Sequence, residues 1–236
     1  MSYARLIRPV IDRVYVSARW AARPRMEAFY ADRGAGLGFE YSFFSGVLAR
    51  PMPAEALADA LVYTDGDMTA ELAQGVVVID EDGAWRLTER GRELALFAQR
   101  ATAEAAAERW SSGPSMLPGL SSAPRLADLV GRVLEAGLAT GGPAFRAMTP
   151  VYEPDDASPA MRLVTRLGAL RHHRADAHRA AWRAAGLTVE QIRALPDGPQ
   201  RQTIEAETDR LDEPAYAVLN VDERWELLAA LGALPS

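Results

Sequence analysis

The chain has 236 residues, a formal net charge of −6 and no cysteine, and all 26 of its basic residues are arginine. These absences exclude a cysteine nucleophile, an iron–sulfur site and a lysine Schiff base. The negative charge argues against a broad electrostatic grip on nucleic acid. No signal peptide or apolar run of membrane-spanning length is recognised, so we expect a cytoplasmic protein with no membrane partner.

The first sixty residues predict several helices. Apolar residues at helical spacing favour a helix over 3–20, and a second helix should follow Pro24. After a glycine-rich break at 34–36, we expect a helix that carries four aromatic residues, namely Phe39, Tyr41, Phe43 and Phe44. Pro53 suits the first turn of a short helix over 54–63, and another short helix is expected over 67–74.

The hydrophobic period then changes from that of a helix to that of a strand. Residues 76–79 and 84–88 predict two antiparallel strands, joined by the tight turn 80–83, and a long helix should follow over 89–110. The segment "GVVVIDEDGAWRLTERGREL" resembles the wing of MarR-type regulators, and the resemblance covers roughly residues 50–98. The resemblance implies a winged-helix segment, and it supports an inference about the fold more strongly than one about the function.

A second helical region should follow a linker at 111–124, which is rich in Ser, Gly and Pro. Helices are expected over 124–138, 159–185 and 200–211, with an irregular stretch at 140–157, a capping box at 188–191 and a final helix capped at 220–223. The fold class is therefore mainly α: a winged-helix segment with one β-hairpin plus a C-terminal helical bundle. The expected division is a first domain at 1–110, the linker, and a second domain at 125–236.

The local charge opposes the DNA-binding function that a winged helix implies. The expected recognition helix carries Asp65, Asp67 and Glu71 and no arginine, and the wing tip is acidic at 80–82. Carboxylates that face phosphates repel them. We therefore expect nucleic acid to be an unlikely partner.

All three histidines lie in the run Arg171-His172-His173-Arg174-Ala175-Asp176-Ala177-His178. At about 100° per residue, Arg174 falls near the centre of an apolar stripe and needs a carboxylate partner, for which Glu205, Glu207 and Asp209 are candidates. His172 points away from the stripe and should be solvated. His173 and His178 diverge by more than roughly 100°, so we expect no metal site.

Two interpretations of this run stay open. In the structural one, Arg174 and Asp176 form an interhelical ion-pair network beside partly buried histidines. In the functional one, His173, Asp176 and His178 are catalytic: Asp176 orients His173 for proton transfer, and Arg174 binds a substrate oxygen. The four aromatics at 39–44 could line a ligand cavity, although aromatics at such spacing more often form plain core.

The phrase "LRHHRADAHRAAWRAAGLT" (170–188) resembles the motif of actinobacterial SalK-like proteins. The matching positions are Leu170, Arg171, His173, Arg174, Asp176, His178, Ala185, Gly186 and Leu187. That family is classified as helix-turn-helix and often neighbours antibiotic-biosynthesis genes, so the resemblance implies a fold and a biosynthetic setting rather than a reaction. The first sixty residues match it only loosely.

Three functions follow as hypotheses. The first is a small-molecule-binding protein or cofactor-independent acid–base enzyme of specialised metabolism, of the lyase, dehydratase, isomerase or cyclase type, on a winged-helix scaffold that does not bind DNA. The second is a transcriptional regulator that senses a metabolite. The third is an interaction protein that forms a homodimer through the long helix at 89–110.

Overall fold

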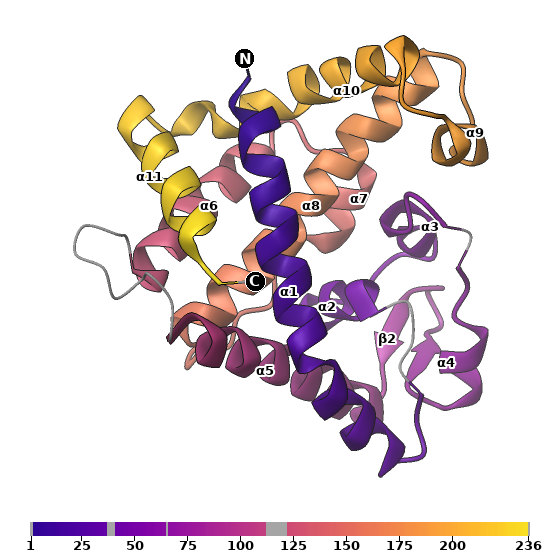
Figure 1. Ribbon diagram of the computed structural model, residues 1–236. Helices are drawn as coiled ribbons and strands as arrows, with labels where there is room; N and C mark the ends of the chain where they lie inside the picture. Colours follow the sequence, from indigo (N-terminus) through magenta and orange to yellow (C-terminus); the bar gives the residue numbers. More distant parts are fainter. Residues whose placement is uncertain (1, 37–40, 65, 112–121, 236) are drawn as a thin grey trace.

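The computed structural model describes residues 2–36, 41–64, 66–111 and 122–235, and this part of the chain is mainly helical with one two-stranded sheet (Figure 1). Up to the end of the long central helix, the elements are α1 (Tyr3–Ala31), α2 (Tyr41–Ala49), α3 (Ala56–Ala60), α4 (Thr69–Ala73), β1 (Val77–Ile79), β2 (Trp85–Leu87) and α5 (Glu89–Ser111). Beyond residue 121 they are α6 (Ala123–Gly137), α7 (Pro143–Met148), α8 (Pro159–Ala184), α9 (Val189–Ala194), α10 (Pro199–Asp212), the 3-10 helix η2 (Glu213–Val218) and α11 (Val221–Ala233).

The β-hairpin is confirmed. Strands β1 and β2 are antiparallel, with Val77 opposite Leu87 and Ile79 opposite Trp85. Gly83, at φ +79°, supplies the left-handed conformation that this tight turn requires. Met52 forms an isolated bridge to Trp85, which attaches the hairpin to the segment before α3.

The first helix is longer than its sequence predicts. We expected a break at Pro24, but α1 continues through both Pro9 and Pro24 to Ala31. Proline in a helix interior costs about 3 kcal/mol, because it removes one hydrogen bond and crowds the preceding turn. The apolar stripe of α1 nevertheless continues past Pro24 through Met26 and Tyr30, both buried, and burial of such side chains offsets a cost of that size.

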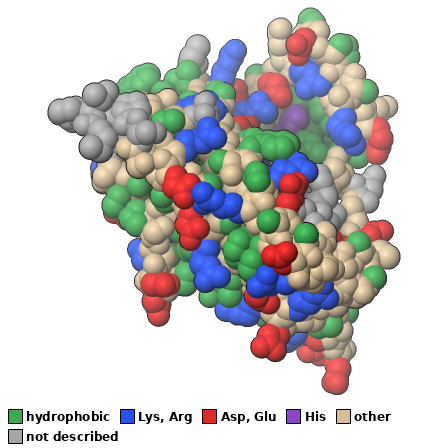
Figure 2. Space-filling view, turned by 60° about the horizontal axis from the view of Figure 1, so that its bottom comes forward, with side chains coloured by type: hydrophobic (Ala, Val, Ile, Leu, Met, Phe, Trp, Pro, Cys, Tyr) green, Lys and Arg blue, Asp and Glu red, His purple; other side chains and the backbone are tan. Residues whose placement is uncertain are grey.

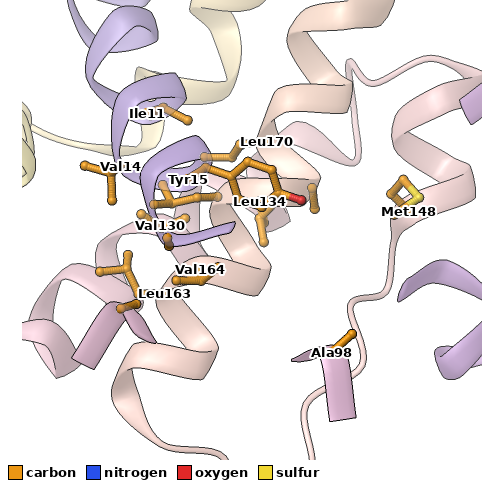
Figure 3. Packing of buried hydrophobic residues seen from close by; sticks show 14 of the residues in the cluster. Ile11, Val14, Tyr15, Ala98, Val130, Leu134, Met148, Leu163, Val164 and Leu170 are labelled. Carbon is orange, nitrogen blue, oxygen red and sulfur yellow. The ribbon is translucent and has the colours of Figure 1, made fainter. Parts of the chain in front are cut away.

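The core joins elements from both ends of the chain. Ile11, Val14 and Tyr15 of α1 pack against side chains of α6 and α8, among them Val130, Leu134, Leu163, Val164 and Leu170 (Figure 3). Helix α5 packs along α1 and α8. The predicted linker at 111–124 lies largely outside the described residues, and the segments on its two sides share this core rather than each enclosing one.

The C-terminal region follows the sequence-based prediction except at α7 and at the 3-10 helix η2, neither of which was expected. Ser158 caps α8 through Met161, the predicted capping box is present at Thr188, and the predicted cap at Asn220 also forms a capping box. The predicted irregular stretch at 140–157 is partly wrong, because α7 begins there at Pro143. None of the described helices is long and apolar enough to cross a membrane.

Candidate functional site

Helix α8 presents its polar residues to five different neighbours. Its apolar stripe is buried as expected, with Leu163, Leu170, Ala177 and Ala181 all inside the protein. The histidines, Arg174 and Asp176 leave the helix in different directions and contact α1, α6, α7, α10 and the segment after α3. The run 171–178 is therefore not one cluster but several separate polar contacts around one helix.

His173 is fully buried and hydrogen-bonded at both ring nitrogens. Its Nδ1 lies 2.6 Å from Oδ1 of Asp212, and its Nε2 lies 2.9 Å from Oγ1 of Thr140. The edge of the ring faces Phe145, with 5.2 Å between centroids. Only 2% of the His173 side chain is exposed, so it does not reach a ligand directly.

The prediction that Asp176 is the carboxylate partner of His173 is wrong. Asp176 instead accepts hydrogen bonds from the backbone N–H groups of Ala144 (3.1 Å) and Phe145 (2.8 Å), and so caps the start of α7 from the neighbouring helix. Pro143 needs no such partner because it has no N–H. Arg179 lies 3.4 Å from the same carboxylate. Burial nevertheless raises the pKa of Asp176, against the effect of these two N–H donors and Arg179.

The interhelical ion pair expected for Arg174 is confirmed. Its guanidinium lies 2.8 Å from Asp209, 3.3 Å from Glu205 and 3.5 Å from Asp212, all on α10. Glu207, the other candidate, pairs with Arg210 instead. Arg174 is 12% exposed and its partner Asp209 is 10% exposed, so this is a largely buried pair that competes little with water.

The sequence carried a signal for Asp212 that we missed. Glu205, Asp209 and Asp212 follow at four- and three-residue spacing, which puts three carboxylates on one face of α10. That acidic face lies opposite Arg174 and His173. For Thr140 and Tyr63, in contrast, the neighbouring residues in the sequence form no motif that would have identified them.

His178 forms a hydrogen-bonded pair with Tyr63, which follows α3. The Tyr63 hydroxyl lies 2.9 Å from His178 Nδ1, and Nε2 of the same ring lies 3.8 Å from Glu205 Oε1. Trp182 packs edge-on against the His178 ring, with 4.9 Å between centroids. Burial lowers the pKa of His178, although Glu205 opposes this, and burial raises the pKa of Tyr63 to about 12.

His172 is not solvated as expected. It is partly buried between α8 and α1, and its Nδ1 lies 3.0 Å from the backbone oxygen of Gly168. Burial lowers its pKa to about 4, and the nearby guanidinium groups of Arg171, Arg179 and Arg19 act in the same direction. The prediction from helical periodicity was wrong because α1 packs against the face of α8 that would be exposed in a lone helix.

His172, Arg174, His178 and Tyr63 line one cavity, which we call the His178 cleft. It has a volume of about 240 Å³, and its remaining lining residues are Arg8, Ile11, Asp12, Ala60, Val62, Leu170, Arg171, Ala175, Glu205 and Tyr216. Arg8, Asp12, Arg174 and Glu205 also line a wider outer hollow of about 1100 Å³. In Figure 2 histidine atoms are visible in a recess between hydrophobic and charged side chains.

Of the four aromatic residues considered for the lining of a cavity, the two whose side chains the structure describes lie in the core. Phe43 and Phe44 are buried in the core, where Phe43 meets Trp85 edge-on, and neither lines the His178 cleft. Phe39 and the side chain of Tyr41 lie outside the described residues. The aromatic residues beside the cleft are instead Tyr63, Trp182 and Tyr216, from distant parts of the sequence.

Within the described ranges, no three His, Asp or Glu side chains are grouped so as to hold a metal ion. Comparison of the chain with protein-family models, with curated proteins and with solved structures found no match.

Proposed function

We propose that this protein binds a small, uncharged or weakly charged molecule in the His178 cleft, and that His178 and Tyr63 act there as an acid–base pair. The observation that carries the proposal is the 2.9 Å hydrogen bond between Tyr63 and His178 at the wall of a cavity large enough for a small ligand. Tyr63 is 40% exposed and lines the cleft, whereas the side chain of His178, to which its hydroxyl is bonded, is 12% exposed.

The pair has the protonation states that proton transfer near neutral pH requires. Because burial lowers the pKa of His178, its ring is neutral, and because burial raises the pKa of Tyr63, its hydroxyl keeps its proton. Nδ1 then accepts the Tyr63 O–H, and the Nε2–H faces Glu205. A proton taken from a ligand by the Tyr63 oxygen can pass to Nδ1, and Glu205 stabilises the resulting imidazolium.

The charges around the cleft favour a ligand with little net charge. Arg8 and Arg171 both pair with Asp12, and Arg174 pairs with carboxylates of α10, so each cation of the lining already has an anionic partner. Deeper in the cleft, Ile11, Val62 and Leu170 offer apolar contact. A small ring that carries a hydroxyl or carbonyl group suits such a lining.

As an enzyme the protein would be cofactor-independent, of the lyase, dehydratase, isomerase or cyclase type, since these reactions require only proton transfers. The resemblance of residues 170–188 to SalK-like proteins supports a setting in specialised metabolism. His173 and Asp176 have no direct contact with the His178 cleft, so we assign proton transfer in the cleft to His178 and Tyr63.

We also propose that α3, α4, the hairpin and α5 form a winged-helix segment that does not bind DNA. Their order supports the first part of this proposal. Helix α4, in the place of the recognition helix, has five residues and no basic side chain, but its Glu71 is buried. The carboxylates at the surface are Asp67, just before α4, and Asp80, Glu81 and Asp82 at the hairpin tip. Asp65 lies outside the described residues. An acidic surface of this kind disfavours the alternative function of a transcriptional regulator.

The third hypothesis, a dimer through α5, has less support. Most of the apolar side chains of α5 are buried against α1 and α8 of the same chain, including Leu94, Ala98, Ala105 and Trp110. Charged residues occupy much of the remaining surface of α5, such as Arg92, Arg100 and Glu104. Such a surface offers little apolar area to a second copy.

A charge series of small probes tests the proposal. Phenol, cyclohexanone, benzoate and benzylamine have rings of similar size but differ in charge, and the three histidine ring resonances report binding by NMR. We expect phenol and cyclohexanone to shift the His178 resonance saturably, and benzoate and benzylamine to do so much less. Tyr63→Phe should weaken phenol binding, whereas Tyr152→Phe, a control whose hydroxyl meets Arg92 outside the cleft, should not.

Proton exchange separates an enzyme from a binding protein. In D₂O, an active acid–base pair should incorporate deuterium beside the cyclohexanone carbonyl, and His178→Gln should lower that rate by about 100-fold, the typical contribution of general base catalysis. Binding without exchange would leave a small-molecule-binding protein. Failure of every probe to shift the His178 resonance would contradict the proposed cleft function.

A further inference from the structure

A second arrangement of functional side chains lies on the other side of α8, away from the His178 cleft. It joins Asp212 at the end of α10, His173 in the middle of α8 and Thr140, which follows α6. We propose that these residues form a nucleophilic relay in which Thr140 attacks activated acyl groups. The proposal does not depend on the function of the His178 cleft.

The geometry is that of an activated hydroxyl. The Asp212 carboxylate lies 2.6 Å from Nδ1 of His173, and the Thr140 hydroxyl lies 2.9 Å from Nε2. Hydrogen bonding to Asp212 fixes the proton on Nδ1, so Nε2 accepts the Thr140 proton. A hydroxyl, a base within hydrogen-bond reach and a group that orients the base are together the signature of an activated nucleophile.

Burial divides the relay into an inner and an outer part. The side chains of Asp212 and His173 are each 2% exposed, whereas Thr140 is an exposed residue. The inner pair is thus shielded from water, and Thr140 is the member through which it reaches solvent.

The surroundings hold the relay rigidly. Phe145 packs edge-on against the His173 ring, and an added Cβ on Gly137 would lie 3.3 Å from Cδ2 of that ring. The second oxygen of Asp212 lies 3.5 Å from the Arg174 guanidinium, which helps to fix the orientation of the carboxylate. The orientation that proton abstraction needs is therefore set before any substrate arrives.

The step balances without a cofactor. The Thr140 oxygen forms a bond to the acyl carbon as the ester C–O bond breaks, the Thr140 proton moves to Nε2 of His173, and the alcohol leaves as its anion. Water then hydrolyses the acyl-threonine, which releases a carboxylic acid, and the protons pass to solvent. Esters with good leaving groups are the substrate class, because such groups depart without acid assistance.

The test uses p-nitrophenyl acetate with the intact protein, and the chain suits it unusually well. Activated esters usually acetylate lysine side chains, and this sequence has none. We expect a burst of p-nitrophenolate, and mass spectrometry of the quenched protein should place the acetyl group on Thr140. Thr140→Val should lower the burst rate by about 100-fold, the usual contribution of a positioned base, and Thr140→Ser should restore it.

Thr203→Val is the matched control, since Thr203 is also exposed but its hydroxyl bonds only to the backbone oxygen of Pro199. It should leave the burst unchanged. His173→Gln should abolish acetylation of Thr140, provided that circular dichroism shows that this variant is folded. If it is unfolded, the burst rates of Thr140→Ser and Thr140→Val test the proposal instead. Acetylation spread over the N-terminal amine and the tyrosines, with none on Thr140, would overturn the proposal, as would an unchanged burst in Thr140→Val.

Discussion

Single residues of α8 decide how the protein uses its few titratable side chains. His172, His173 and His178 are close in sequence but have different hydrogen-bond partners: the backbone oxygen of Gly168, the Asp212 carboxylate and the Tyr63 hydroxyl. The same residue type therefore has three different chemistries within one run of the chain.

The ion pairs of Arg174 with the carboxylates of α10 should contribute strongly to the stability of the protein. Arg174→Ala leaves Asp209 and Asp212 without their guanidinium in a largely buried place, and should lower the free energy of unfolding by about 3–5 kcal/mol. Arg210→Ala is the control, because Arg210 is 68% exposed and pairs with Glu207 on its own helix; it should cost less than about 1 kcal/mol. Urea unfolding measures both. Equal effects from the two variants would mean that the buried network adds no stability.

His172 should make the protein sensitive to acid. Its pKa is about 4 in the folded protein against 6.5 for the free side chain, so the unfolded chain binds the extra proton between these values. The stability is therefore complete above about pH 6.5 and is lost as the pH falls towards 4. Between pH 7 and pH 5 the loss from this residue should approach about 2 kcal/mol. Urea unfolding of the protein and of His172→Gln at both pH values measures it, and an equal acid loss in the two would contradict the assignment.

At the scale of elements, the packing partners override local preference. Helix α1 continues through Pro24, because the part beyond the proline packs on α5: Phe29 stacks on Phe97, and the Tyr30 hydroxyl donates to the backbone oxygen of Leu94. Helix α7 forms where an irregular stretch was expected, because Asp176 of α8 accepts its first free N–H groups. In both cases the deciding group is distant in sequence.

Pro24→Ala tests the first of these cases. If packing alone carries α1 through the proline, alanine should restore the missing hydrogen bond and raise the free energy of unfolding by about 1–3 kcal/mol. Thermal or urea unfolding shows the change. A loss of stability would instead indicate that the core is fitted to the local geometry that Pro24 imposes.

The charge of the molecule argues against the DNA-binding function that the order of its elements would suggest. The order of elements from α3 to α5 resembles that of DNA-binding winged helices, yet the net charge is −6 and carboxylates lie at Asp67, just before α4, and at the hairpin tip. Binding to duplex DNA depends on neutralising phosphates. The described residues follow the element order of a winged helix but do not provide the basic surface that DNA binding requires.

We therefore expect only weak association with duplex DNA. Fluorescence anisotropy at physiological salt should give a dissociation constant no tighter than about 10⁻⁶ M, the range of non-specific contacts. Nanomolar affinity for the DNA beside its own gene would contradict this and would favour a regulator.

Features that depend on short-range patterns could be predicted from the sequence. The hairpin followed from alternation and a glycine turn, and helix starts followed from caps such as Ser158 and Thr188. The pairing of Arg174 with α10 followed from a charged residue on an apolar stripe. These inferences hold because each rests on residues within one or two helical turns, where geometry is fixed by the backbone.

Only the tertiary structure decided which side chains meet. Asp212 rather than Asp176 holds His173, and Thr140 completes that relay from 33 residues away. Tyr63 reaches His178 across 115 residues, while Phe43 and Phe44 enter the core instead of a cavity. Such contacts depend on how helices pack against one another, which is set by the summed fit of many side chains and has no local pattern in the sequence.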